Sequence, residues 1–455
     1  MNSEGRAHSQ GHTSANWATV NPCIVCAPLG AALVFKGIEG CMSVLHGSQG
    51  CATYIRRYLI SHFREPIDIA SSSFTEDTVV FGGEANLSKA VRSVIKTYKP
   101  KIIGIATTCL AETIGEDLTM LIAGIKKEIG NEDVEIIAVH SPSYKDSHVG
   151  GFDSAVRAVL RHLPQKAVAT DLCGLIPGMI SPQDIRTAKG IASMYSVRLV
   201  VFPDYSETLD AGLWNSYQAI PGGGTTRKEI ESLGGSRMLF DWTAKPHGAG
   251  REFAIDHGTP FCHSLPPIGI QATDSFCNAL STISGVEMPR LLREERERLL
   301  DSYVDGHKYV SGYNVAICCD DPLVRALTLF CLEIGLVPVL VATGRAENDF
   351  EQCIRDMCKD PASDATVLPQ ADFDRIDEVL GETHVDLCVG TSKLQSFAEK
   401  RNVPLMRVGF PIHDRFGAAR VSHIAYSGAQ QLFDRIVNTL IAARQKDANE
   451  QWSYV

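Results

Sequence analysis

The sequence predicts an α/β protein of three domains, each with a mostly parallel sheet flanked by helices. Short apolar runs alternate with helical stretches along the whole chain, which is the pattern of parallel sheets covered by helices. The chain has 455 residues, 44% of them hydrophobic, which is too many for a single hydrophobic core and enough for several. The strands expected from the apolar runs cover residues 101–106, 134–139, 197–202, 315–318, 338–342 and 385–389.

The domains are expected in the following order. Residues 1–20 are polar and lack the apolar core of a signal peptide, so we expect an N-terminal arm. The first domain is expected over residues 21–163, the second over 165–298 and the third over 310–455. Residues 291–304, dense in Arg and Glu at helical spacing, predict a solvated helix that joins the last two. Ligands of open parallel sheets bind beyond the carboxyl ends of the strands, so functional residues are expected in the loops there.

Charge and composition exclude two kinds of binding partner. A net charge of -10 and a pI near 5.8 do not provide the clustered Lys and Arg of a nucleic-acid-binding surface. The chain has no run of about eighteen apolar residues, so we expect no membrane-spanning helix and a cytoplasmic protein. Its fourteen cysteines are therefore expected to be reduced, and most of them to be core residues.

Three cysteines of the first domain stand in unusual surroundings. Cys26, Cys51 and Cys109 each lie near Gly, Pro, Ser or Thr, in loops that let the backbone approach a bulky ligand and offer donors to a thiolate. They are 25 and 58 residues apart, unlike the Cys-x-x-Cys pairs of zinc ribbons and bacterial ferredoxins. An iron-sulfur site would require them to converge from separate loops. Unrelated core thiols are the alternative, and the spacing leaves both open.

Motifs around these cysteines occur in a specific order. They are Cys-Ala-Pro-Leu-Gly-Ala from Cys26, His-Gly-Ser-Gln-Gly-Cys up to Cys51, His-Phe-Arg-Glu-Pro from His62, Phe-Gly-Gly from Phe81, Thr-Thr-Cys-Leu-Ala-Glu around Cys109 and Ser-Pro-Ser-Tyr from Ser141. In this order and spacing, residues 21–152 closely resemble the β subunit of nitrogenase component 1. Weaker matches continue to the end, as in Asp-Asp-Pro from Asp320 and Gly-Phe-Pro-Ile-His-Asp-Arg from Gly409, and the middle domain, including residues 248–250, matches least.

The resemblance implies the nitrogenase component 1 fold and an oxidoreductase function. The chain would be the β-type subunit of an ATP-dependent nitrogenase-like reductase and would hold half of an [8Fe-7S] P-cluster through Cys26, Cys51 and Cys109. The α-type subunit would hold the other half in an α2β2 core. The cluster would relay electrons from a homodimeric, ATP-hydrolysing [4Fe-4S] iron protein to an iron-sulfur cofactor in the α-type subunit, which leaves no catalytic residue to assign on this chain. Ser143 aligns with a serine that can join the coordination of the oxidised cluster; a turn with Pro142 is the alternative interpretation.

The resemblance also assigns expectations to three residues outside the cysteine motifs. Phe81 corresponds to an exposed aromatic at which the iron protein docks, although a Phe after Val79 and Val80 would by pattern alone be a core residue. Arg64 and Glu65 correspond to residues near a metal between two β-type subunits. A salt bridge between Arg64 and Glu65 explains the dipeptide equally well.

Other cysteines are interpreted as structural. Cys23 lies three residues before Cys26, but the Pro-Leu-Gly that follows Cys26 favours Cys26 as the ligand, so Cys23 is expected to be a small buried thiol. Cys318 and Cys319 end an expected strand without further candidate ligands near them, and are expected in the core.

Two other functions compete with the electron-relay function. A scaffold subunit for nitrogenase cofactor assembly would share the fold, but such β-like subunits usually lack part of the three-cysteine set. A metal-free nucleotide-sugar or dinucleotide-binding protein would need a Gly-x-Gly-x-x-Gly turn after a strand, which the sequence lacks. It also lacks a Walker-type Gly-x-x-x-x-Gly-Lys-Ser/Thr motif, so ATP hydrolysis is expected in the separate iron protein.

The sequence leaves the substrate open. The chain lacks the long N-terminal extension that many molybdenum nitrogenase β subunits carry before the first cysteine. This departure favours a vanadium-type or iron-only-type enzyme, or a methylthio-alkane reductase, which reduces carbon-sulfur bonds. The last is preferred, because the vanadium and iron-only families match the region between Cys51 and Phe81 less closely; dinitrogen is the other candidate substrate.

Overall fold

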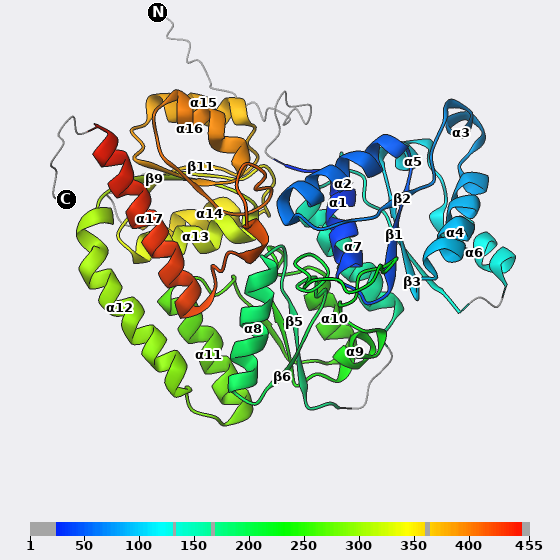
Figure 1. Ribbon diagram of the computed structural model, residues 1–455, viewed down its shortest axis with the longest axis horizontal. Helices are drawn as coiled ribbons and strands as arrows, with labels where there is room; N and C mark the ends of the chain where they lie inside the picture. The colour runs from blue at the N-terminus through cyan, green and yellow to red at the C-terminus, as the bar shows by residue number, and fades with distance from the viewer. Residues whose placement is uncertain (1–23, 131–132, 165–168, 360–364, 448–455) are drawn as a thin grey trace, which may run out of the picture.

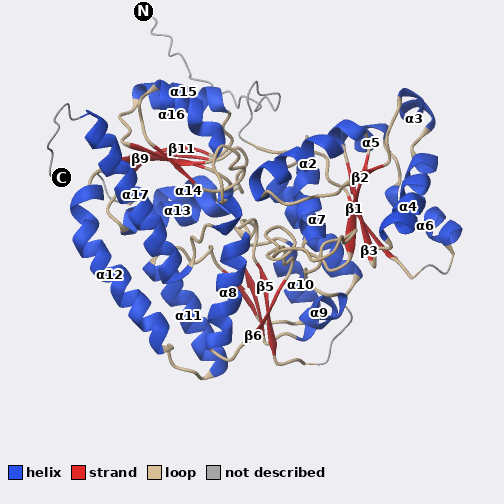
Figure 2. Ribbon diagram, viewed as in Figure 1, coloured by secondary structure: helices blue, strands red, loops and turns tan. Residues whose placement is uncertain are grey.

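Three parallel sheets form the framework of the protein (Figure 1). The computed structural model describes residues 24–130, 133–164, 169–359 and 365–447. The strand orders are β2-β1-β3-β4, β6-β5-β7-β8 and β11-β10-β9-β12-β13, and all paired strands of these sheets run parallel. Helices cover the sheets, as the colouring by secondary structure shows (Figure 2). The predicted α/β class with three parallel sheets is confirmed.

The helices and strands follow one another along the chain as expected for such sheets. The first sheet contains β1 (Cys41–His46), β2 (Ala70–Ser71), β3 (Ile102–Thr107) and β4 (Glu135–Val139). Its helices are α1 (Ala27–Lys36), α2 (Gln49–Phe63), α3 (Glu76–Phe81), α4 (Glu84–Tyr98), α5 (Cys109–Ile114), α6 (Leu118–Ile129) and α7 (His148–His162).

The second and third sheets repeat this alternation. The second part contains β5 (Leu172–Ile176), α8 (Pro182–Met194), β6 (Arg198–Val201), α9 (Arg227–Ser232), η1 (Leu233–Gly235), β7 (Met238–Asp241), α10 (Ala249–His257), β8 (Phe261–His263) and α11 (Ile270–Ser284). After α12 (Arg290–Val310), the third contains β9 (Asn314–Cys318), α13 (Asp321–Glu333), β10 (Val337–Ala342), α14 (Phe350–Met357), β11 (Thr366–Leu368), α15 (Phe373–Glu382), β12 (Leu387–Gly390), η2 (Ser392–Leu394), α16 (Gln395–Lys400), β13 (Leu405–Arg407), η3 (Ala418–Arg420) and α17 (Ala425–Asp447).

The expected strands are present with ends that move by one or two residues, as β3, β4, β6, β9, β10 and β12. The expected helix over residues 291–304 is the core of α12, whose Leu292, Leu299 and Val310 are buried while its charged residues face outward. No described helix is long and apolar enough to cross a membrane. The domain boundaries stay a prediction, and the expected arm of residues 1–20 lies outside the described residues.

The backbones of helices α1 and α7 are in direct contact. A Cβ atom at Gly30 would lie 1.8 Å from the carbonyl oxygen of His148, and one at Gly151 would lie 1.9 Å from that of Ala27. Beside this contact, Cys26 and Ser147 form an isolated antiparallel bridge, and the His148 N-H donates to the Val25 carbonyl at 3.0 Å. The start of α1 is therefore fixed against the start of α7.

Buried polar contacts join the three parts of the chain. His148 Nε2 of α7 lies 3.0 Å from Asp320 Oδ1 at the start of α13. The Asp184 carboxylate of α8 accepts the backbone N-H of His423 at 2.7 Å and that of Ile424 at 3.2 Å, just before α17. Burial alone would raise the pKa of Asp184, but the His423 ring and these N-H donors outweigh it and hold the pKa below its usual range.

We predict that Gly30→Ala destabilises the protein by more than about 3 kcal/mol, because the neighbouring atom is a backbone oxygen that cannot rotate away. Gly190 is the matched control: it also lies inside a helix, α8, and has no heavy atom within 4 Å of the Cβ position. Gly190→Ala should be neutral or stabilise by up to about 1 kcal/mol. Denaturant unfolding of both variants measures this; equal effects would show that α1 and α7 separate without cost.

Candidate functional site

The three candidate cysteines lie at three helix N-termini. Cys26 is the N-cap residue of α1, and Cys109 is the first residue of α5. Cys51 is the third residue of α2, after the N-cap Ser48. His46 at the end of β1 pairs with Thr107 at the end of β3, so the segments that carry Cys51 and Cys109 leave adjacent strands at the same level. Helix N-termini carry free N-H groups and partial positive charge, which favour anionic sulfur.

Ser143 connects two of these cysteines. Its backbone N-H donates to the Cys109 Sγ at 3.2 Å, and its Oγ accepts from the Ala27 N-H, next to Cys26, at 3.1 Å. The turn interpretation also holds, because the Lys145 N-H donates to the Pro142 carbonyl at 3.1 Å. The turn thus places Ser143 between Cys26 and Cys109. The turn interpretation of Ser143 is therefore compatible with its interpretation as a candidate cluster ligand.

Burial and neighbouring thiolates raise the pKa of two of the three thiols. Burial, followed by the charges of Cys51 and Cys109, raises the pKa of Cys26 to about 11. Burial and then the charge of Cys109 raise the pKa of Cys51. Three thiolates together are therefore costly without a cation, and metal binding would have to displace their protons.

The arrangement does not suit a single metal ion. Across the described ranges, no three His, Cys, Asp or Glu side chains are grouped closely enough to hold one. Cys26, Cys51 and Cys109 are half-buried rather than fully buried. Each of the three cysteines is thus partly accessible from outside the chain.

The remaining candidate cysteines take no part in this site. Cys318 and Cys319 are buried in hydrophobic clusters, as expected from the sequence. Cys23 lies outside the described residues.

Phe81 is one of the most exposed aromatic side chains of the described chain. It ends the short helix α3 with 85% of its surface exposed, so the alternative that it is a core residue is wrong. The reason is local, because α3 lies on the outer side of the first sheet and only Thr78 of this helix is buried.

Two residues that the sequence did not single out hold the turn after Phe81. The Glu116 carboxylate accepts the Gly83 N-H through Oε1, and its Oε2 lies 2.7 Å from Nε2 of the fully buried His46. His46 also contacts Ser72 Oγ at 3.0 Å through Nδ1. The only sequence signal for this network was His46 itself, in the motif that ends at Cys51; nothing in the sequence pairs it with Glu116.

Arg64 and Glu65 do not pair with each other. Arg64 ends α2 with a left-handed φ of 64° and donates to the His413 carbonyl at 3.2 Å, whereas Glu65 Oε1 accepts the Ala211 N-H at 3.1 Å. The salt-bridge interpretation is therefore wrong, because the backbone turns the two side chains toward different segments. Burial raises the pKa of Glu65.

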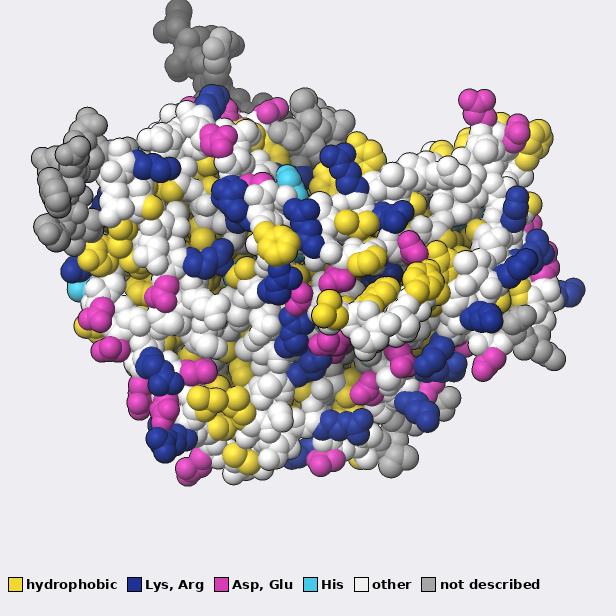
Figure 3. All heavy atoms as spheres, viewed as in Figure 1, with side chains coloured by type: hydrophobic (Ala, Val, Ile, Leu, Met, Phe, Trp, Pro, Cys, Tyr) yellow, Lys and Arg dark blue, Asp and Glu magenta, His cyan; other side chains and the backbone are white. Residues whose placement is uncertain are grey.

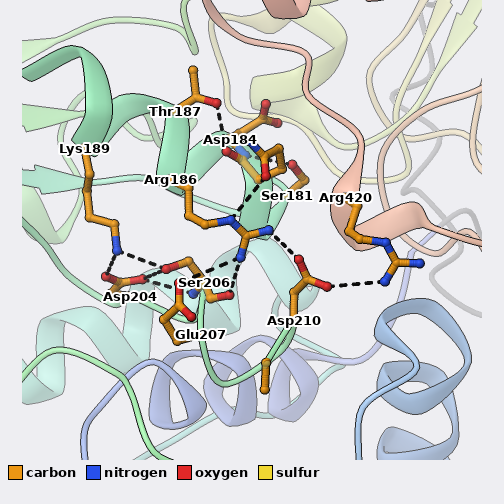
Figure 4. Close-up of polar contacts among 12 residues, drawn as sticks. Ser181, Asp184, Arg186, Thr187, Lys189, Asp204, Ser206, Glu207, Asp210 and Arg420 are labelled. Carbon is orange, nitrogen blue, oxygen red and sulfur yellow. Dashed lines mark hydrogen bonds and ion pairs between the residues drawn. The ribbon is translucent and has the colours of Figure 1, made fainter. Parts of the chain in front are cut away.

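Asp210, the acidic neighbour of Glu65, already has cationic partners. Figure 4 shows Asp210 between Arg186 and Arg420, and Lys189 beside Asp204. Arg420 Nη1 lies 3.4 Å from Asp210 Oδ1, and Lys189 Nζ lies 2.7 Å from Asp204 Oδ2. No Lys, Arg or His nitrogen of the described residues lies within 4.0 Å of the Glu65 carboxylate oxygens. A metal ligand role of Arg64 and Glu65 stays a prediction.

Comparisons with known proteins give a consistent family. Residues 26–441 match the model of the nitrogenase component 1 type oxidoreductases. The nitrogenase molybdenum-iron protein beta chain of Clostridium pasteurianum is 33% identical over 95% of both chains. That of Frankia alni is 36% identical over 93% of this chain and 83% of its own.

Solved structures show the same likeness. A chain of "Nitrogenase Cp1 at pH 6.5" superposes with a TM-score of 0.92 and 32% identity over 97% of both chains. A chain of "Nitrogenase Cp1 at pH 5" has a TM-score of 0.72 at 14% identity over 96% of this chain and 92% of its own, which is a likeness of fold alone.

We predict that Cys26 of the metal-free protein is almost inert to iodoacetamide at neutral pH. With a pKa of about 11, only about one thiol in ten thousand is ionised at pH 7, and the reactive thiolate should increase tenfold per pH unit up to that pKa. Mass spectrometry of the labelled peptide against pH, with glutathione as the reference thiol, measures the rate. A plateau below pH 9 would contradict the raised pKa.

Proposed function

Because the chain belongs to the family of nitrogenase component 1 type oxidoreductases, we propose that it is the β-type, electron-relaying subunit of an ATP-dependent nitrogenase-like reductase. The observation that carries this proposal is the convergence of Cys26, Cys51 and Cys109 at three helix N-termini. In the proposal, the reducible substrate binds in a partner subunit and not on this chain.

The residues present fit half of an [8Fe-7S] P-cluster, which when bound accepts and donates electrons one at a time. Cys26, Cys51 and Cys109 would supply three thiolates. The Ser143 N-H already points at the Cys109 sulfur, and such donors adjust the potential of a thiolate-bound cluster. The three helix N-termini stabilise negative charge at the same place. The half-exposure of the cysteines leaves room for an α-type subunit to supply the remaining ligands in an α2β2 core.

A scaffold subunit for cofactor assembly is the alternative within the same fold. The complete set of three cysteines favours the relay, because a scaffold transfers its cluster and needs no permanent ligand set on this subunit. Ser143 between Cys26 and Cys109 supports the same choice, since it builds a donor into the site.

For the substrate we propose dinitrogen as the first to assay. The Clostridium pasteurianum and Frankia alni relatives carry the name nitrogenase molybdenum-iron protein beta chain. The compactness that favoured methylthio-alkanes does not separate the two candidates, because the Clostridium pasteurianum chain is matched over 95% of its own length. Carbon-sulfur bond reduction is the second activity to assay with the same preparation.

The exposed turn at Phe81 is the proposed docking point for the homodimeric [4Fe-4S] iron protein. An exposed aromatic on a rigid turn is a strong interface anchor. The turn is rigid here because Glu116 holds the Gly83 N-H and is itself held by His46, whose strand leads to the segment of Cys51.

We predict that Cys51→Ala removes the bridging cluster. Anaerobic co-purification with the α-type partner should yield roughly eight irons per αβ pair beyond those of the partner's cofactor, with their EPR signal, and the variant should lose them. Cys262→Ala is the control, because Cys262 is also half-buried but lies on β8, away from the site. Folded, iron-free wild-type protein that the mutation leaves unchanged would refute the relay function.

We predict that Phe81→Ala weakens binding of the iron protein at least tenfold, since truncating a central aromatic anchor typically costs more than about 1–2 kcal/mol. Phe416→Ala is the control, because Phe416 is equally exposed at 82% but belongs to the third part of the chain. Biolayer interferometry with the nucleotide-bound iron protein measures both affinities. An unchanged affinity of the Phe81 variant, with cluster content intact, would place the docking surface elsewhere without affecting the cluster assignment.

A further inference from the structure

A second candidate binding region lies far from the cysteines, beside the C-terminal helix. A cavity of about 850 Å³ opens between α17 on one side and α16 and the edge strand β13 on the other. Figure 1 shows α17 running along the flank of the third sheet. Volumes of this size accommodate small organic ligands. None of the residues assigned to the electron-relay function lines this cavity.

The walls of the cavity combine apolar and cationic side chains. The apolar part includes Val403, Leu405, Met406 and Ala442. The cationic residues are Arg407, Arg415, Arg435 and Lys446, against the single lining carboxylate of Glu399. Figure 3 shows Lys and Arg side chains gathered in the middle of one face of the molecule.

Two of these arginines already share a carboxylate. Asp414 lies 2.6 Å from Arg407 and 3.5 Å from Arg415. Elsewhere in the chain, the buried Arg325 contacts Asp321 at 2.5 Å and Asp349 at 2.8 Å. The buried Arg325 and Arg407 are thus both paired with carboxylates of this chain.

Arg435 departs from this rule. Its Nη1 is shielded from solvent and has no hydrogen-bond partner among the described residues, and its Nη2 donates only to the Arg407 carbonyl at 3.4 Å. No carboxylate of the described chain forms an ion pair with it, and burial lowers the pKa of Arg435 with no charged group opposing the shift. A partly buried cation with a solvent-shielded, unused donor is costly, and a fixed anion relieves that cost.

We propose that this cavity binds an organic carboxylate, whose anionic head is held by Arg435 and whose apolar body lies against Val403, Leu405 and Ala442. The guanidinium suits a carboxylate because its N-H groups form a planar fork. Asn438, one turn from Arg435, and Lys446 near the end of α17 offer further donors on the cavity wall. The site is independent of the proposed electron-relay function.

Octanoate, a carboxylate with an apolar chain, is the probe. Calorimetric titration of the full chain should show binding that Arg435→Gln weakens at least tenfold. Arg444→Gln is the matched control, because Arg444 lies on the same helix but is exposed and stacks on Tyr313 at 4.7 Å. Equal binding by the Arg435 variant, or no binding of millimolar octanoate by the wild type, would overturn the proposal.

Two further measurements distinguish a free carboxylate ligand from a neighbouring subunit's side chain and from a structural role of Arg435. The same titration on the co-purified complex should still show binding; its loss there would mean that a carboxylate of a neighbouring subunit fills the site, and would overturn the free-ligand proposal. Arg435→Met keeps the apolar stem and removes the charge, so its Tm without octanoate should equal or exceed that of the wild type, and octanoate should no longer raise it. A marked fall in Tm without octanoate would show that Arg435 is structural and would overturn the proposal.

Discussion

Helices α1 and α7 meet so closely that a carbonyl oxygen occupies the space where each of two glycines would carry a side chain. This contact fixes the first turn of α1 against the segment that precedes α7. Cys26 begins α1 and Ser143 lies just before α7, so the separation between these residues follows directly from the helix contact. Ser143 in turn reaches Cys109, which transfers the same constraint to the loop after β3. The relative positions of Cys26 and Cys109 thus follow from one backbone contact and one turn, whereas Cys51 is placed by the register of β1 and β3.

The electrostatics of the cysteine site are balanced between opposing effects. Burial raises the pKa of Cys26 and Cys51, and each additional thiolate raises it further. Helix N-termini and the Ser143 N-H act in the opposite sense, because they favour negative charge. Cys26 and Cys51 are therefore neutral thiols in a place that favours anions, which is the arrangement expected of ligands that lose their protons only on binding a highly charged metal cluster.

Much of the fold could be predicted from the sequence, because apolar runs and turn residues are local signals. The strands around Ile105, Ile137 and Ile317 are of this kind. Convergence of Cys26, Cys51 and Cys109 could be suspected from their Gly-, Pro- and Ser-rich loops, but their meeting depends on the register of β1 and β3. Features that depend on which residue lies on the other side of a tertiary contact could not be predicted. Phe81 follows two valines, yet its helix lies outside the sheet, so a local apolar pattern gave the wrong burial.

The contacts of the Asp184 carboxylate limit which segments can be exchanged between related proteins. It is buried in the second part of the chain, and its donors come from residues 422–424 of the third. A segment from a distant relative that covered Asp184 without placing these donors would leave the buried carboxylate without partners, which is costly. The 3.0 Å approach of His148 Nε2 to Asp320 Oδ1 also places the first part against the third. The three sheets resemble interchangeable modules. Because of these shared polar contacts, however, recombination between distant relatives yields a folded protein only when the donor segment and the acceptor segment come from the same parent.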